Sequence, residues 1–349
     1  MSGQVSPSSF LPVDSLDMLG ATAGLGDQIE AALAGARPAI REAAYDNVVV
    51  FGMGGSAVAG AVAAALGAAS SPVPILPLGG YRAPSFLSPT TLAFAVSFSG
   101  ETEETLAAAG EAAARGAELV AITEGGSLAE LAAASGGEVL TIPPGIPQPR
   151  AALGAMTARL LLALEEAGLL DGARHQLELA AAQLSRRLPV LAAGGGPAGE
   201  IARRIGRTIP LAHGGAGLGE VAARRFKTQV NENAKAPAFA GSEPEVCHNE
   251  LCGFGQSGDV TRQLLTLVSL RLEDDDGQTQ RRFGLFAELA GEALSDHVEM
   301  TGEGEGPLAR FFDLVAIGDF VSLHLAAAEG VDPGPVPVLA EVKERLSSR

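Results

Sequence analysis

The chain has no tryptophan, two tyrosines and two cysteines among its 349 residues. The cysteines, Cys247 and Cys252, are too few for a disulfide framework, so we expect a reducing compartment, the cytoplasm. Basic residues are also scarce, since 24 Lys and Arg stand against 41 Asp and Glu and give a net charge of −17. This acidity argues against nucleic acid or an anionic membrane as a partner. It does not exclude a local pocket of positive charge. Hydrophobic residues make up 47% of the chain, which excludes intrinsic disorder.

Charge is missing altogether from residues 48–81, a stretch long enough to resemble a transmembrane helix in a hydropathy window. Glycines such as Gly52, Gly60 and Gly67 interrupt it. A buried strand, a turn and an Ala-rich helix account for these glycines better than a transmembrane helix does. The first basic residue is Arg37, so no charged segment precedes an apolar core and we expect no signal peptide.

Strands alternate with helices along both halves of the chain. Strands are expected at 46–52, 73–78, 91–97, 118–122, 138–142, 208–212, 263–272 and 297–300. Helices are expected at 56–66, 103–115, from 127, at 151–166, 219–235, 281–293 and 308–328, and at the end of the tail 332–345. The alternation predicts an α/β fold of two similar domains, 1–170 and 171–349. Each would be a mostly parallel sheet flanked by helices on both faces.

A glycine-rich turn, Gly52-Met53-Gly54-Gly55-Ser56, follows the first expected strand and opens a helix. Glycine lets backbone N–H groups approach an anion at a helix N-terminus. The spacing fits neither GxGxxG nor a Walker A loop. A tight strand-to-helix turn explains the same glycines without any ligand.

Four hydroxyl residues lie within nine positions after the third expected strand: Ser97, Ser99, Thr102 and Thr105. With the free N–H groups of a first helical turn they would form a neutral cup for a phosphate monoester. The alternative is a capping box, with Ser99 or Thr102 as the N-cap.

The scarce polar residues gather in one region. Two of the three lysines and three of the four asparagines lie between 227 and 249. Glu232 and His248, sixteen residues apart, supply the carboxylate and imidazole that usually move protons. An exposed helix end with a capping histidine is the alternative. A zinc site at Cys247, His248 and Cys252 lacks a second Cys/His cluster to complete it.

Arg150 ends the Pro-rich loop 143–149, and the preceding proline restricts the approach to it. It is either a fixed functional cation or an ordinary surface arginine. The other histidines, His175, His213, His297 and His324, fit no motif and are expected to be structural.

Two motifs resemble a known family. G-M-G-G-S followed by S-x-S-G-x-T-x-E-T resembles the sugar isomerase (SIS) domain over the first half of the chain. N-E-N-x-K, then the His-Asn pair and C-terminal Lys343, resemble the bifunctional phosphoglucose/phosphomannose isomerases over nearly the whole chain. That family has two SIS domains. The resemblance implies a homodimeric aldose–ketose isomerase, without cofactor or metal, that acts on glucose 6-phosphate. Whether mannose 6-phosphate is also a substrate is left open.

The resemblance also implies roles for particular residues. Phosphate would be bound by Ser97, Ser99, Thr102 and Thr105, flanked by Gly54, Gly55 and Ser56. Glu232 would be the base that forms a cis-enediolate, and Arg150 would offset its charge. His248, supplied across the dimer interface, and Lys343 would open the sugar ring.

The sequence departs from the family pattern at three positions. Phe98 and Glu101 stand where relatives often carry Tyr and Asn, and Glu101 brings a negative charge near the expected phosphate. Val336 replaces a threonine associated with the use of both C2 epimers, which puts mannose 6-phosphate turnover in doubt. A non-catalytic phosphosugar-binding SIS protein and an isomerase for another phosphosugar therefore stay open. Acidity and the lack of an added helix-turn-helix region disfavour a DNA-binding regulator.

Overall fold

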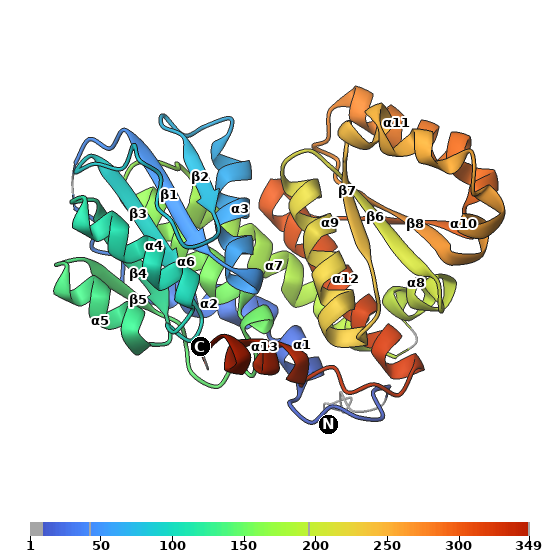
Figure 1. The fold of residues 1–349 in the computed structure, drawn as a ribbon, viewed down its shortest axis with the longest axis horizontal. Coiled ribbons are helices and arrows are strands. Elements are labelled where there is room, and N and C mark those ends of the chain that lie inside the picture. The colour runs from blue at the N-terminus through green and yellow to red at the C-terminus, as the bar shows by residue number, and fades with distance from the viewer. Residues whose placement is uncertain (1–9, 42, 195, 348–349) are drawn as a thin grey trace.

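The computed structural model describes residues 10–41, 43–194 and 196–347, and places two α/β halves side by side (Figure 1). The first half is built on a five-stranded parallel sheet in the order β2-β1-β3-β4-β5, and the second on a four-stranded parallel sheet in the order β7-β6-β8-β9. The strands are β1 (Asn47–Gly52), β2 (Ile75–Leu78), β3 (Thr91–Val96), β4 (Glu118–Thr123), β5 (Glu138–Thr141), β6 (Ile209–Gly215), β7 (Phe239–Glu243), β8 (Leu265–Arg271) and β9 (Asp296–Thr301). The expected fold class of two domains with parallel sheets is confirmed.

Helices cover both sheets. In the first half they are α1 (Met18–Ala23), α2 (Leu25–Ala34), α3 (Ala57–Gly67), α4 (Glu103–Ala114), α5 (Gly126–Ala134) and α6 (Leu153–Glu166). The second half has α7 (Ala173–Ala192), α8 (Pro197–Ile205), α9 (Leu218–Gln229), α10 (Gly258–Leu264), α11 (Gly277–Ala290), α12 (Pro307–Ala328) and α13 (Pro337–Ser347). Shorter turns that matter below are η2 (Gly54–Ser56), η3 (Pro149–Ala151), η5 (Glu245–His248) and the π-helical turn η4 (Val230–Ala234).

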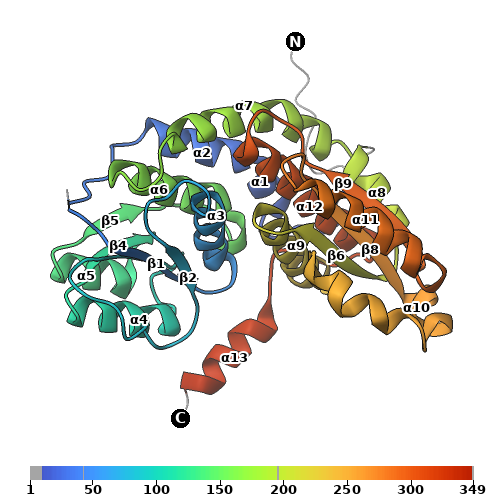
Figure 2. The ribbon, with the colours of Figure 1, turned by 90° about the horizontal axis from the view of Figure 1, so that it is seen from above.

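The strands of the first sheet are apolar on both faces because helices cover both. Val48 and Val50 of β1 face the core that contains α6, whereas Val49 and Phe51 face the core that contains α4 and α5. Figure 2 shows these two helical layers on opposite sides of the sheet. A continuous apolar run is what such a doubly covered parallel strand requires.

Helix α12 is long and apolar enough to cross a membrane, but 89% of its apolar window is buried inside the protein, as in a core helix. It packs against α7, α8 and α9. The uncharged stretch 48–81 forms β1, η2, α3 and β2, as expected. Helix α7 contacts both α2 and α12 and so bridges the halves, and a domain division at 170/171 stays a prediction.

Several elements differ from the sequence-based expectation. Residues 263–264 end α10 instead of beginning a strand, and the helix expected at 219–235 is α-helical only to Gln229. Strand β7 was not expected because its residues FAGSE form no apolar run, and its first two residues are exposed at the sheet edge. Helix α7 was not expected from the sequence, and it carries an internal proline, Pro189.

Candidate active site

Arg150 and Glu232 meet where the two halves face each other. Arg150 lies in η3, directly after Pro149, and its side chain is only 3% exposed. Its Nη1 donates to Oε2 of Glu232 at 3.3 Å, and its Nε donates to Oδ1 of Asn233 at 2.9 Å. The surface-arginine alternative is therefore wrong, since this guanidinium is buried and directed at the proposed base.

The other side of the Arg150 guanidinium is held by backbone. Nη2 donates to the carbonyl oxygens of Pro333 at 2.6 Å and Gly334 at 2.8 Å, in the segment that leads to α13. Burial lowers the pKa of Arg150 and the adjacent Glu232 carboxylate opposes that shift. Guanidinium stays charged throughout the biological pH range. These contacts fix one orientation of a cation beside a carboxylate.

Glu232 and Asn233 are presented by the π-helical turn η4, which continues α9. Single π turns inside helices are rare and are found frequently at functional sites. Lys235 ends the turn in the left-handed region, with φ 55°. Its Nζ donates to the Glu232 carbonyl and, at 3.2 Å, to the Pro333 carbonyl, so the turn is also tied to the segment before α13.

A buried ion pair lies behind Arg150. Arg225 of α9 and Asp319 of α12 are both about 3% exposed and pair through two hydrogen bonds of 3.0 and 2.5 Å. Nη2 of Arg225 also donates to the Arg150 carbonyl at 3.0 Å. Asn233 donates to Oγ of Ser322, one turn further along α12. Sequence reasoning missed this support, although an acid within the apolar run of α12 was a usable signal.

The glycine-rich turn lies directly against Arg150. Gly54 has φ +54°, which favours glycine. A side chain at Gly55 would place its Cβ 3.0 Å from the Arg150 Cα, a tight contact that the Arg150 backbone would have to yield to. Ser56 is buried at the start of α3. The G-M-G-G-S motif thus lies against the backbone of Arg150.

The hydroxyl-rich loop precedes α4, as expected. Thr102 is the N-cap but makes no capping hydrogen bond, because its hydroxyl lies 2.9 Å from Ser97 Oγ. Neither Thr102 nor Ser99 forms the capping box that was the alternative interpretation, and Ser99 instead accepts from the Glu101 N–H. The Thr105 hydroxyl is buried and has no hydrogen-bond partner in the described part of the chain. The first-turn N–H groups of α4 are left for another acceptor.

The charge of Glu101 is directed away from this loop. Its Oε1 accepts from the Ser127 N–H at 2.7 Å, and its Oε2 lies 2.9 Å from Ser127 Oγ, at the start of α5. These hydrogen bonds lower the pKa of Glu101. The carboxylate therefore stabilises the α5 N-terminus.

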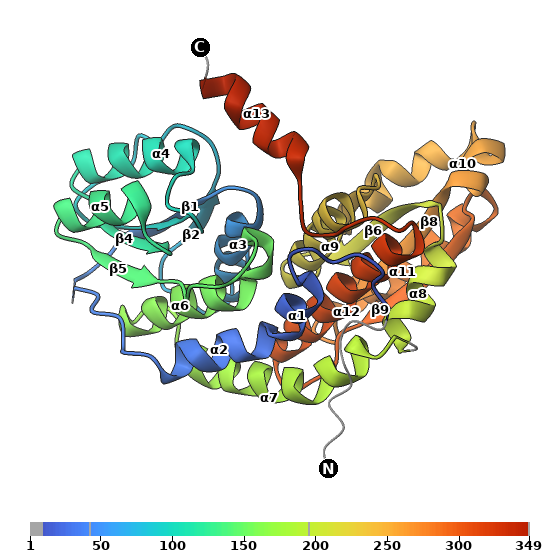
Figure 3. The same ribbon diagram turned by 90° about the horizontal axis from the view of Figure 1, so that it is seen from below.

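His248 and Lys343 lie apart from the Arg150 cluster. His248 is exposed in η5, and no hydrogen bond in the described chain joins it to Glu232 or Arg150. Lys343 lies on α13, which projects from the body of the molecule (Figures 2 and 3). Cys247 and Cys252 are free thiols, and the described residues contain no group of three or more metal-binding side chains, so the zinc alternative gains no support.

The chain matches known families over both halves. Residues 43–161 match the SIS domain, and residues 195–346 match the bacterial phospho-glucose isomerase C-terminal SIS domain. The bifunctional phosphoglucose/phosphomannose isomerase of Caldicellulosiruptor bescii is 35% identical over 306 residues, which cover 86% of this chain and 90% of that protein. The protein of the same name from Aquifex aeolicus is 34% identical over 303 residues, which cover 86% of this chain and 91% of the relative.

The fold also resembles a solved structure, the C-terminal domain of glucosamine-fructose-6-phosphate aminotransferase from Francisella tularensis. The TM-score is 0.69 at 15% identity, over 91% of this chain and 96% of that one. At this identity the likeness concerns the fold alone. With its two SIS domains and its full-length relatives, the chain belongs to the bifunctional phosphoglucose/phosphomannose isomerase family.

Proposed function

We propose that this chain is an aldose–ketose isomerase that interconverts glucose 6-phosphate and fructose 6-phosphate through a cis-enediolate, without a metal. The ion pair of 3.3 Å between Arg150 and Glu232 carries the proposal. A fixed cation beside a carboxylate suits a reaction in which the base removes a proton while negative charge develops on neighbouring oxygens.

The phosphate group of the sugar is anchored at the loop before α4. Ser97, Ser99, Thr102 and Thr105 offer hydroxyls, and the N-terminus of α4 offers N–H groups and the positive end of the helix dipole. The unpartnered Thr105 hydroxyl and the missing cap on α4 support this assignment. Gly54, Gly55 and Ser56 flank the ligand because their turn follows β1, the neighbour of β3, and lies against the Arg150 backbone.

Proton transfer follows from the position of Glu232. Its carboxylate removes the proton from C2 of the open-chain aldose, and the C2 electrons form the C1–C2 double bond of the enediolate. Arg150 offsets the negative charge on oxygen. The O2 proton then moves to O1, and Glu232 returns its proton to C1 as the C2=O bond forms, which yields the ketose. One base suffices because the two carbons are adjacent.

Ring opening requires His248 and Lys343, which move protons between the ring oxygen and O1. In one chain His248 is exposed and separate from Glu232, which fits a histidine supplied to a partner's site. Helix α13, the helix of Lys343, exposes an apolar stripe: Val338 (64%), Leu339 (47%), Val342 (50%) and Leu346 (57%). Such a stripe supports a homodimer that covers it. Cytoplasmic location belongs to the same proposal.

Val336 bears on whether mannose 6-phosphate is a substrate. This half-buried residue precedes α13 and lacks the hydroxyl that the family's threonine provides. The relatives from C. bescii and A. aeolicus are named for both sugars. We propose activity on glucose 6-phosphate, with mannose 6-phosphate as the weaker substrate.

A coupled isomerase assay in EDTA tests the proposal with fructose, glucose and mannose 6-phosphates. Glu232→Gln removes the base while keeping its shape. Glu220→Gln on α9 is the matched control, because the Glu220 side chain is 41% exposed and pairs with the exposed Arg224. We expect turnover that EDTA leaves intact and that Glu232→Gln abolishes. Tight phosphosugar binding without turnover would show that the protein is a phosphosugar sensor and not an isomerase.

A further inference from the structure

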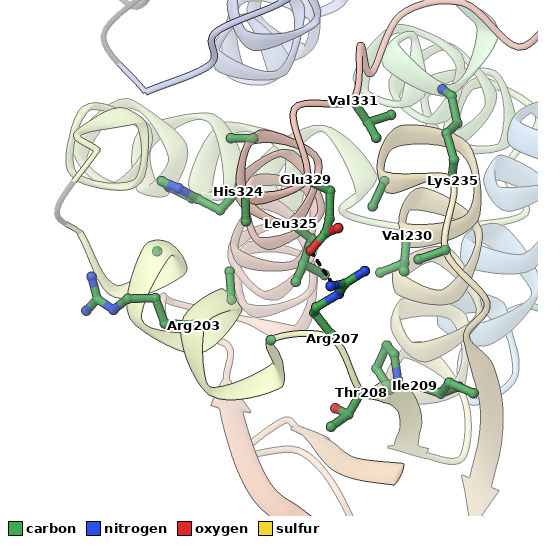
Figure 4. Close-up of a pocket in the computed structure, with 18 of the residues that line it drawn as sticks. Arg203, Arg207, Thr208, Ile209, Val230, Lys235, His324, Leu325, Glu329 and Val331 are labelled. Carbon is green, nitrogen blue, oxygen red and sulfur yellow. Dashed lines mark ion pairs between the residues drawn. The ribbon is translucent and has the colours of Figure 1, made fainter. Parts of the chain in front are cut away.

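A groove of about 800 Å³ lies behind the active site, at the amino end of β6 (Figure 4). Its walls come from α8, the end of α12 and the π-helical turn η4. We call it the β6–α12 groove. Its volume is in the range of small-molecule sites, and none of its lining residues takes part in the proposed isomerisation.

The groove shares a wall with the active site. Val230 and Ala234 of η4 line the groove, whereas Glu232 and Asn233 of the same turn contact Arg150. The Lys235 side chain also lines the groove while its Nζ donates to the Glu232 and Pro333 carbonyls. A change in packing on one side of this five-residue turn therefore reaches the base on the other side.

The lining combines an apolar floor with a cationic rim. Val230, Ala234 and Leu325 contribute apolar surface. Arg203 and Arg207 supply positive charge in a chain of net charge −17. Figure 4 shows Arg207 over the middle of the groove, where its Nε lies 3.4 Å from Oε1 of Glu329. The Arg207 side chain is 86% exposed, so it can turn to an anion at little cost.

One wall is aromatic. Phe10 and His324 stack with ring centroids 3.9 Å apart and an interplanar angle of 18°. His324 is 9% exposed, and its Nε2 has no hydrogen-bond partner within the described chain. Buried polar atoms are usually paired. A polar atom without a hydrogen-bond partner, His324 Nε2, within an aromatic wall favours a ligand that is both aromatic and polar.

We propose that the β6–α12 groove is a regulatory site for a small organic acid with an aromatic ring and one anionic group. The ring packs on the apolar floor beside Phe10 and His324, and the anionic group pairs with Arg207, which turns from Glu329 to meet it. The ligand braces Val230 and Ala234 and so stabilises the π turn, which is otherwise the less stable helical form. This regulatory half rests on the proposed role of Glu232, and it predicts tighter phosphosugar binding when the groove is filled.

Fluorescence titration with 8-anilinonaphthalene-1-sulfonate tests the site, because this probe is an aromatic anion whose signal is independent of turnover. We expect one saturable site per chain. Arg207→Ala should raise its Kd about tenfold, the equivalent of about 1.4 kcal/mol. Arg82→Ala is the matched control, because Arg82 is 87% exposed and pairs with Glu111 at the same 3.4 Å. Ala328→Trp, from an exposed position in the lining, should abolish binding. A Kd that neither groove variant changes would overturn the site.

The coupling is tested by repeating the titration with saturating fructose 6-phosphate. We expect the probe's Kd to fall about fivefold, and the Kd of the sugar to fall equally with the probe bound, since coupling between binding sites is reciprocal. Mutually exclusive binding would mean that the probe occupies the active site and would overturn the proposal. An unchanged Kd would overturn the regulatory half. Failure of the isomerase proposal would appear separately, as absent turnover with the titration unaffected.

Discussion

The guanidinium of Arg150 and the carboxylate of Glu232 are in hydrogen-bond contact although 82 positions separate them in the chain. One comes from the loop that ends the first sheet and the other from the π turn after α9. The contact depends on both halves of the molecule, because Asn233 and the Pro333 and Gly334 carbonyls complete the shell of Arg150. The candidate active site therefore depends on the packing of the two domains against each other.

Arg150→Lys should lower kcat by at least about 100-fold, the usual loss for one charge-stabilising donor. An ammonium group cannot reach Glu232, Asn233 and two carbonyls in four fixed directions. The melting temperature should fall as well, since buried acceptors lose their donor. Steady-state kinetics and thermal unfolding check this prediction. A variant with normal kcat would mean that only the charge at position 150 matters.

Asp319→Ala should lower the free energy of unfolding by about 3–5 kcal/mol, because it leaves the buried Arg225 guanidinium without a counter-charge. The double variant Asp319→Leu/Arg225→Met should recover much of that loss, since two apolar side chains replace a buried pair. Urea unfolding measures both. If the double variant were as unstable as the single one, the cost would come from packing rather than from an unpaired charge.

The sheets were predictable because their strands are buried on both faces and read as apolar runs, as in β1 and β3. Edge strand β7 was not predictable, because FAGSE is half exposed and is held mainly by pairing with β6. The π turn could not be predicted from the sequence for a different reason. Residues 230–234 carry two asparagines, which weaken a helix but do not indicate a π turn, and the register of the turn depends on contacts of Asn233 and Lys235 with distant segments.

The site was predictable to the extent that its chemistry uses scarce residues. The cluster of asparagine and lysine pointed to Glu232, and the proline loop pointed to Arg150. Arg225, one of two adjacent arginines in helix α9, carried no such signal in the sequence, and its role became clear only from its pairing with Asp319 in the structure. The role of His248 stays a prediction, since a single chain does not test an interface.

Glu101→Gln should change the Kd for a hexose 6-phosphate by less than about twofold. The carboxylate already faces Ser127 and the α5 N-terminus, and a glutamine can accept the same N–H hydrogen bond. Isothermal titration calorimetry at pH 7.5 measures the Kd. Tightening of tenfold or more would show that the Glu101 charge repels the phosphate, contrary to its orientation here.

His324 should make the protein lose stability as the pH falls from about 6.5 to 4. Burial lowers the pKa of His324 to about 4. Between that value and the unfolded pKa near 6.5, the unfolded chain binds the extra proton, so acid favours unfolding. The His324 contribution is up to about 3 kcal/mol over this window.

Urea unfolding at several pH values isolates this contribution by difference. His324→Phe keeps an aromatic ring against Phe10 and removes the titration, so its stability should fall less steeply on acidification. The control His175→Gln alters a histidine whose side chain is 68% exposed and should leave the slope unchanged. Equal slopes in His324→Phe and the wild type would contradict a buried neutral imidazole.

The most direct test of the account is isomerisation in D2O, followed by NMR at C1 and C2 of the sugar. Transfer by Glu232 passes the proton through a carboxylic acid that exchanges with solvent, so deuterium should appear at C2 of glucose 6-phosphate made from fructose 6-phosphate. Glu232→Gln should abolish both turnover and exchange, while Glu220→Gln should keep both. Turnover without any deuterium, or full activity of Glu232→Gln, would contradict an enediolate formed by this base.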